Sequence, residues 1–267
     1  MVEVRVNRLA AALLGLLAAT PCFAAPKPAQ RPPLSTQPIS LMTVPWWHAR
    51  HEAKLAEARR SPVDLVFLGD SITQDYEKSG PPAWQDFVPV WQHFYGDRHP
   101  LNLGFSGDAT SHLLWRMEHG EVDGMSPKVA IILIGANGLG RLHWSTEENV
   151  RGIEAVVAET RRKLPTTKIL LLGVLPSERS AYATETTREI NQSLAAEYGN
   201  HAVPSVTFVD ASAVFLHNGV IDRSLFLDPL LTPPAAPLHP SAEGQARLAT
   251  AIEPTLASLL GDRDHTR

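Results

Sequence analysis

Four short segments of this sequence carry side chains that could act together on an ester bond. The first is Gly69-Asp70-Ser71, which follows an apolar run and precedes a helix-like segment. A serine hydroxyl at the start of a helix lies where backbone N–H groups and the helix dipole favour developing negative charge. Taken alone, the same pattern also fits an ordinary Asp or Ser helix cap. The Gly-x-Ser-x-Gly motif is absent around Ser71, which disfavours a hydrolase with a nucleophile elbow.

The other three segments also combine glycine with polar side chains. Residues 104–108 include Gly107, residues 135–137 end in Asn137, and residues 237–241 place His239 just before a helix-like segment. Each has an ordinary explanation, as a glycine turn, a turn asparagine or a surface histidine. Their joint occurrence with Ser71 favours one shared polar site, provided that the fold brings the four segments together.

Five apolar runs supply the elements that would position these segments. Apolar runs of this length are typical of strands buried on both faces. Strands that alternate with helices predict right-handed βαβ units and a parallel sheet covered on both sides. The predicted fold is therefore α/β, a three-layer α/β/α sandwich with a five-stranded parallel sheet in one domain. The predicted strands are residues 63–68, 101–103, 129–134, 169–174 and 206–209.

The predicted helices include residues 46–60 and a segment that begins at Ser145, where Ser145 and Glu148 have capping-box spacing. Thr186 and Glu189 repeat that spacing on a later helix, and a last helix is predicted from near Ser241 to about residue 260. Pro254 is expected to kink or break that last helix. In such sheets ligands bind outside the carboxyl ends of the strands. All four polar segments fall at this edge.

The chain resembles the SGNH/GDSL hydrolase superfamily, which has a flavodoxin-like α/β/α fold, and within it the platelet-activating-factor acetylhydrolase Ib catalytic subunits. The resemblance covers most of the chain after the first 44 residues and weakens after Phe226. It rests on residues 66–71, 101–108, 114–121, 127–129 running into 135–137, and 169–176.

The resemblance implies a role for each polar segment. Ser71 would be the nucleophile and His239 the general base. The oxyanion hole would consist of the Ser71 N–H, the Gly107 N–H and the Asn137 side-chain amide. A serine hydroxyl needs a neighbouring base that accepts its proton, which agrees with this assignment.

Two features depart from the family pattern. The family usually places its acid three residues before the histidine, where this chain has Ala236. Asp228 lies further upstream, as though the segment carried an insertion, and could curl back to orient His239. Alternatively, Asp228 only opens a turn before Pro229 and a backbone carbonyl orients the histidine. The family also commonly has a second asparagine after Asn137, where this chain has Gly138, and Gly140 follows.

The N-terminus has the pattern of an export signal. Arg5 and Arg8 precede an apolar stretch at residues 9–19, and cleavage is expected after Ala24. We therefore predict a signal peptide at 1–24, a Pro-rich linker at 25–43, the hydrolase domain at 44–261 and a tail at 262–267. The alternative of a membrane anchor is disfavoured, because the apolar stretch is shorter than the roughly 20 residues that a bilayer requires. The only cysteine, Cys22, lies within the predicted signal, so a thiolate nucleophile or zinc-thiolate site is not expected.

Composition and spacing also limit the partners. A formal net charge of −4 without a basic patch makes nucleic acid an unexpected partner. His48 and His51 lie three residues apart, but no third ligand has a suitable spacing, so no metal is expected. No cofactor is implied, and after signal cleavage no stable membrane insertion is expected. The resemblance implies a monomer or a homodimer.

Taken together, these features predict a periplasmic or secreted carboxylic ester hydrolase. It would cleave short acyl groups, acetyl first, from a small-molecule or glycan ester substrate such as an O-acetylated glycan. A thioesterase or lysophospholipase of the same superfamily remains an alternative. So does a catalytically impaired binding protein that keeps the fold, which Ala236 motivates.

Overall fold

A parallel five-stranded sheet forms the centre of the computed structural model, which describes Met1 and residues 32–266. The strand order is β2-β1-β3-β4-β5. Gly69 at the end of β1 pairs with Gly104 of β2 and with Leu133 of β3. The carboxyl ends of these three strands are therefore level, and the loops that follow them emerge at one edge. The strands are β1 (Leu65–Gly69), β2 (Pro100–Gly104), β3 (Val129–Leu133), β4 (Lys168–Leu172) and β5 (Val206–Val209).

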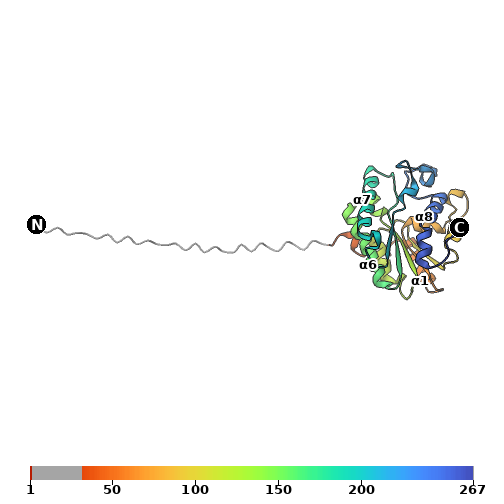
Figure 1. Cartoon of the computed structure of the whole chain (residues 1–267), viewed down its shortest axis with the longest axis horizontal. Helices are drawn as coiled ribbons and strands as arrows, with labels where there is room; N and C mark the ends of the chain where they lie inside the picture. Colours follow the sequence, from red (N-terminus) through yellow and green to blue (C-terminus); the bar gives the residue numbers. More distant parts are fainter. Residues whose placement is uncertain (2–31, 267) are drawn as a thin grey trace. The chain divides into compact units, whose positions relative to one another are not determined.

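Helices cover both faces of the sheet (Figure 1). Alternate residues of each strand point to opposite faces, so Val66 and Leu68 pack into one core while Leu65 and Phe67 pack into the other. The three-layer α/β/α sandwich predicted from the sequence is confirmed. The first core is shared with α4 (Thr110–Arg116), α6 (Thr146–Lys163) and α7 (Ala181–Tyr198). The second core is shared with α3 (Val88–Tyr95) and α8 (Ala242–Leu260).

Two helices differ from the sequence-based prediction. Helix α7 begins five residues before Thr186, because the Ser180 hydroxyl accepts a hydrogen bond from the Ala183 N–H and caps the helix there. Thr186 is instead buried within α7. Helix α8 runs through Pro254 without a break and is capped by Ser241, as expected. The predicted Ser145 cap of α6 is also present.

The boundaries of the folded unit are wider than predicted. Residues from Pro32 onward belong to one compact unit, so residues 32–43 are not a free linker. Ser35 is fully buried, and its carbonyl accepts a hydrogen bond from the Thr110 hydroxyl on α4. At the other end, residues predicted as a tail are bound to the domain, because Asp262 pairs with Arg98. The predicted signal peptide, Cys22 and the rest of the predicted linker lie outside the described residues.

Several short elements complete the part of the chain that the structure describes. Helix α1 (Pro45–Ala58) matches the first predicted helix, and a two-stranded sheet of β6 (Leu216–His217) and β7 (Val220–Ile221) lies outside the main one. Helices α2 (Ser71–Gln74) and α5 (Ala136–Gly140) each start within two or three residues of a strand end. Within the described residues, no helix combines the length and apolar character needed to cross a bilayer.

Candidate active site

Ser71 is the first residue of α2, directly after the end of β1. The carboxylate of Asp70 caps α2 by accepting a hydrogen bond of 3.0 Å from the Ile72 N–H. This capping contact fixes the turn between strand and helix, and so fixes where the Ser71 hydroxyl points. Ser71 itself is 8% exposed, so neighbouring residues cover most of its surface.

Ser71, His239 and Asp228 form a continuous hydrogen-bonded line. The Ser71 Oγ lies 3.0 Å from His239 Nε2, and His239 Nδ1 lies 2.8 Å from Asp228 Oδ1. The second carboxylate oxygen of Asp228 accepts hydrogen bonds from the backbone N–H groups of Leu238, at 2.8 Å, and His239, at 2.6 Å. One carboxylate therefore holds both the imidazole ring and the backbone that carries it.

The path of the chain between Asp228 and His239 explains how this contact forms. Asp228 starts a single 3₁₀ turn, Asp228–Leu230, and its carbonyl accepts a hydrogen bond from the Ala235 N–H. The Leu227 N–H donates to the His239 carbonyl at 2.9 Å. These bonds close the segment into a loop whose two ends lie side by side. The carboxylate thus reaches His239 from Asp228, while Ala236 has no group that could do so.

Electrostatic interactions along the line of Ser71, His239 and Asp228 favour an ionised Asp228 and a basic His239. Burial alone lowers the pKa of His239, but the hydrogen bond and charge of Asp228 outweigh it, with help from Asp75 and Asp70, and raise that pKa above its usual value. For Asp228, burial raises the pKa, and the hydrogen bonds from His239 and Leu238 more than offset this and lower it. The imidazole is therefore the group that accepts a proton here.

Asn137 connects the loops that carry Ser71 and Gly107. It is buried on α5, and its Nδ2 donates to the Asp108 carbonyl at 2.9 Å and approaches Asp70 Oδ2 at 3.5 Å. Gly107 has a φ of +80°, a conformation that L-residues with a side chain rarely adopt. The structure thus brings Asn137 beside the two loops from which the sequence predicted the other oxyanion-hole donors.

Asp70 is a buried carboxyl of this site whose role the sequence did not predict. Burial raises its pKa to about 7, against the lowering effect of the Ile72 N–H and of His239. Its carboxylate contacts both the Ile72 N–H, in the turn that carries Ser71, and the Asn137 side-chain amide. The charge of Asp70 therefore acts on both segments. The Gly69-Asp70-Ser71 motif is the only sequence feature that singles out Asp70, and from that motif alone Asp70 is interpreted as a helix cap.

The sequence profile of the GDSL-like lipase/acylhydrolase family matches residues 67–247, a span that contains Ser71, Asn137 and His239. The chain belongs to this family. The human platelet-activating factor acetylhydrolase IB subunit alpha1 is 28% identical over 216 residues, which are 80% of this chain and 84% of that protein. The proposed resemblance to these subunits is confirmed.

Solved structures show the same fold. A GDSL-like lipase from Bacteroides thetaiotaomicron aligns with a TM-score of 0.60 at 17% identity, covering 79% of this chain and 97% of that one. A carbohydrate acetylesterase from Sinorhizobium meliloti, Est24, aligns with a TM-score of 0.54 at 18% identity, covering 74% and 99%. At these identities the two structures support the fold of this GDSL-like chain and not its substrate.

A buried charged network lies behind the Gly107 loop of this GDSL-like domain. Asp108 Oδ1 accepts from Trp47 Nε1 at 2.8 Å, and Asp108 Oδ2 accepts from Arg116 Nε at 2.8 Å. Arg116 also pairs with Glu121 and donates to the Gly69 carbonyl at 3.3 Å. The network therefore ties the end of β1 to the loop after β2. Burial raises the pKa of Asp108 to about 6, although Arg116 and Trp47 oppose this.

His51 belongs to this network and not to a metal site. Its Nδ1 lies 2.9 Å from Glu121 Oε1, and its ring is buried and stacked on Trp47. His48, three residues earlier, is exposed and lies 3.9 Å from Glu52. Across the described part of the chain, no three His, Cys, Asp or Glu side chains are arranged to hold a metal ion.

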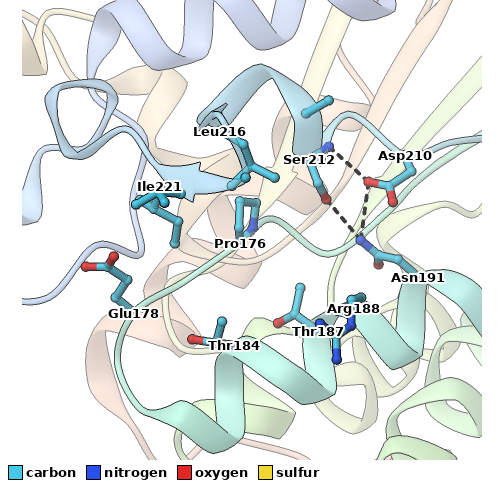
Figure 2. A pocket seen from close by; sticks show the side chains of 13 residues that line it. Pro176, Glu178, Thr184, Thr187, Arg188, Asn191, Asp210, Ser212, Leu216 and Ile221 are labelled. Atoms are coloured by element: carbon cyan, nitrogen blue, oxygen red, sulfur yellow. Dashed lines mark hydrogen bonds between the residues drawn. The ribbon is translucent and has the colours of Figure 1, made fainter.

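A pocket of about 550 Å³ lies between α7, the loop after β4 and the β6–β7 hairpin (Figure 2). Its walls combine Leu216 and Ile221 with Thr184 and Asp210. Ser71, Asn137 and His239 are not among its lining residues. The loop after β4 connects this pocket to the site, because the Glu178 N–H donates to the Pro237 carbonyl.

Proposed function

We propose that this protein is a serine esterase that removes short acyl groups, acetyl first, from a hydroxyl group. The observation that carries the proposal is the hydrogen-bonded line from Ser71 Oγ to His239 Nε2 and from His239 Nδ1 to Asp228 Oδ1. In this proposal Ser71 is the nucleophile, His239 the general base and Asp228 the acid that orients the imidazole.

In the first half-reaction, Ser71 Oγ attacks the carbonyl carbon of the ester and His239 Nε2 takes the hydroxyl proton. The tetrahedral intermediate collapses, the bond to the alcohol oxygen breaks, and His239 returns its proton to the leaving alkoxide. An acyl group then remains on Ser71 Oγ. In the second half-reaction, His239 takes a proton from water, the resulting hydroxide attacks the acyl carbon, and Ser71 Oγ leaves with that proton.

The negative oxygen of each intermediate needs hydrogen-bond donors already in place. We assign this role to the Ser71 N–H, the Gly107 N–H and the Asn137 Nδ2. Loss of a single such donor typically slows turnover by about 10²–10³-fold. The anchoring of Asn137 to the Asp108 carbonyl supports the assignment, because a preorganised donor pays no reorganisation cost during the reaction.

For the substrate we propose an O-acetylated glycan, met by an exported protein in the periplasm or outside the cell. The similarity to a platelet-activating factor acetylhydrolase subunit supports the acetyl group. The export pattern at residues 1–24 supports the location. The protein would act as a monomer or homodimer, without a cofactor.

Replacement of the nucleophile tests the catalytic proposal. Ser71→Ala should abolish turnover of 4-nitrophenyl acetate, by up to about 10⁶-fold in kcat, and should abolish labelling by a fluorophosphonate. The fold should persist, since only one oxygen is removed. Turnover unchanged in Ser71→Ala would reject Ser71 as nucleophile, and a wild-type protein that neither turns over esters nor reacts with the fluorophosphonate would be the binding protein considered above.

Acyl-chain profiling tests the acetyl preference. Among 4-nitrophenyl esters from acetate to dodecanoate, kcat/KM should be highest for acetate and fall with chain length. A maximum at long chains would instead assign the thioesterase or lysophospholipase function.

A further inference from the structure

Two arginines lie at the loops that carry the proposed oxyanion hole. Arg141 follows α5 directly, and its Nη1 lies 3.4 Å from the Gly107 carbonyl. Arg179 comes from the loop after β4, and its Nη2 donates to the Ala136 carbonyl at 2.9 Å. Ala136 immediately precedes Asn137. Each guanidinium therefore rests on the backbone of a segment that holds a proposed oxyanion donor.

Two glycines make room for these guanidinium groups, Gly107 in the segment after β2 and Gly140 after Asn137. A Cβ on Gly140 would overlap with the Arg179 guanidinium, and a Cβ on Gly107 would overlap with Arg141 Nη1. Gly140 lies in the segment after Asn137, where this chain has Gly138 in place of the family's second asparagine. Its lack of a side chain lets Arg179 lie against α5, where it donates to the carbonyl of the residue before Asn137.

Neither arginine is neutralised by an ion pair within the described residues. Within that part of the chain, the backbone carbonyls of Gly107 and Ala136 are the only acceptors of their guanidinium groups. Arg179 is half-buried, and its Nε–H is buried without any partner. An unpaired guanidinium with a buried free donor is costly, because burial removes its water without supplying an acceptor. Such a group is expected to meet an anion in the functional complex.

The nearest carboxylates do not fill this role. Burial lowers the pKa of Arg179, while the charges of Asp70 and Asp228 raise it and that of Arg141 lowers it further. Asp70 already accepts from the Ile72 N–H, and Asp228 is bound to His239 on both oxygens. Their charges reach Arg179 through space, but both carboxylates are held by other donors.

We propose that Arg141 and Arg179 bind an anionic group, a carboxylate or a phosphate, carried by the alcohol part of the ester substrate. Guanidinium groups present several donors in a plane and match the oxygens of both anions. Since the two arginines flank the proposed oxyanion hole, the anion would lie close to the scissile ester. The substrate class is therefore an acetylated sugar acid or acetylated sugar phosphate. This inference rests on the proposed function.

Matched pairs of charged and neutral esters test the inference. We would measure kcat/KM for an acetylated hexuronic acid and for its neutral methyl ester, and for an acetylated sugar phosphate and the same sugar without phosphate. The wild-type protein should prefer at least one charged partner by roughly tenfold, mainly through KM, as expected for a hydrogen-bonded charge. The preference should shrink at high salt. The preferred pair then identifies carboxylate or phosphate as the natural anion.

Variants connect the preference to the two side chains. Arg141→Gln and Arg179→Gln should each reduce the charged-to-neutral ratio, and the double variant should abolish it. Arg161→Gln removes an exposed arginine of α6 and should leave the ratio unchanged. Equal kcat/KM for charged and neutral esters in the wild type would overturn the inference, as would a ratio that survives in the double variant.

A binding measurement separates this inference from the proposed function. In the Ser71→Ala variant, calorimetry with the uncleaved pairs should again show tighter binding of the charged partner, whether or not the wild-type protein hydrolyses it. Tighter binding without hydrolysis would reject the esterase and keep the anion site. Hydrolysis with equal binding would keep the esterase and reject the anion site.

Discussion

The single carboxylate of Asp228 holds His239 both at its imidazole ring and at its backbone N–H. Asp228 Oδ1 binds Nδ1, while Oδ2 binds the N–H groups of Leu238 and His239. Nδ1 must then carry the proton, so Nε2 is left free to accept one from Ser71. Sequence could locate Ser71 and His239 because their neighbours are local motifs. It left the role of Asp228 open, because nothing local fixes the path of the ten residues between Asp228 and His239.

Asp228→Asn should therefore affect both rate and pH dependence. His239 must be neutral to act as base, so kcat/KM of the wild type should rise with pH through a pKa above about 6.5. Without the charge of Asp228, this inflection should move to lower pH. The amide also favours the wrong tautomer, which costs about 10⁴-fold in turnover in a Ser-His-Asp triad. A pH–rate profile measures both the shift of the inflection and the loss of turnover.

Asp123→Asn is the matched control for that variant, because Asp123 is exposed and pairs with Lys163 on the protein surface, away from His239 in the hydrogen-bond network. It should keep the wild-type profile. If Asp228→Asn kept both the inflection and the rate, a backbone group would be orienting His239, and the site would work as a Ser–His dyad.

At the scale of elements, apolar runs predicted all five strands to within two residues at each end, because buried parallel strands have an unmistakable composition. The first residues of the helices were predicted less accurately than the strand ends. Thr186 and Glu189 have the spacing of a cap but lie inside α7, since Ser180 caps the helix first. Contacts between elements could not be predicted. Arg179 lies on α5 only because β4 and β3 are neighbours in the sheet.

The link between α1 and the Gly107 loop is such a contact, and Trp47→Phe tests it. Trp47 is fully buried, and its Nε1–H is a donor to Asp108. The variant leaves a buried carboxylate oxygen without that donor, which should cost about 1–3 kcal/mol of unfolding free energy. Because the Asp108 carbonyl anchors Asn137, kcat should fall as well. Urea unfolding and 4-nitrophenyl acetate turnover measure the two effects.

Trp46→Phe makes the same change one residue away, where the side chain is 46% exposed. It should change the free energy of unfolding by no more than about 0.5 kcal/mol and leave kcat unchanged. Equal effects of the two variants would mean that the hydrogen bond to Asp108 is dispensable. Stability lost without any loss of kcat would confine the role of Trp47 to folding.

For the molecule as a whole, composition and periodicity predicted the α/β fold correctly but assigned residues 32–43, which pack against it, to a linker. Residues 25–43 look like a linker because Pro, Gln and Ser lack periodicity, yet irregular backbone can pack as tightly as a helix. The Ile39 N–H donates to the Ser111 carbonyl, and Ser35 lies against Gly152 of α6, where a Cβ would overlap with it. Residues 32–43 therefore pack against α4 and α6.

A chain that begins at Val44 should accordingly be less stable than one that begins at Pro32. It loses the bonds from Thr110 to the Ser35 carbonyl and from Ile39 to Ser111, and it exposes the face that Ser35 covers. We expect a loss of about 1–3 kcal/mol in unfolding free energy, measured with urea. Since α4 begins three residues after Gly107, turnover of 4-nitrophenyl acetate should fall at temperatures well below unfolding. Equal stability and turnover for the two chains would show that residues 32–43 contribute no more than a linker does, despite their contacts.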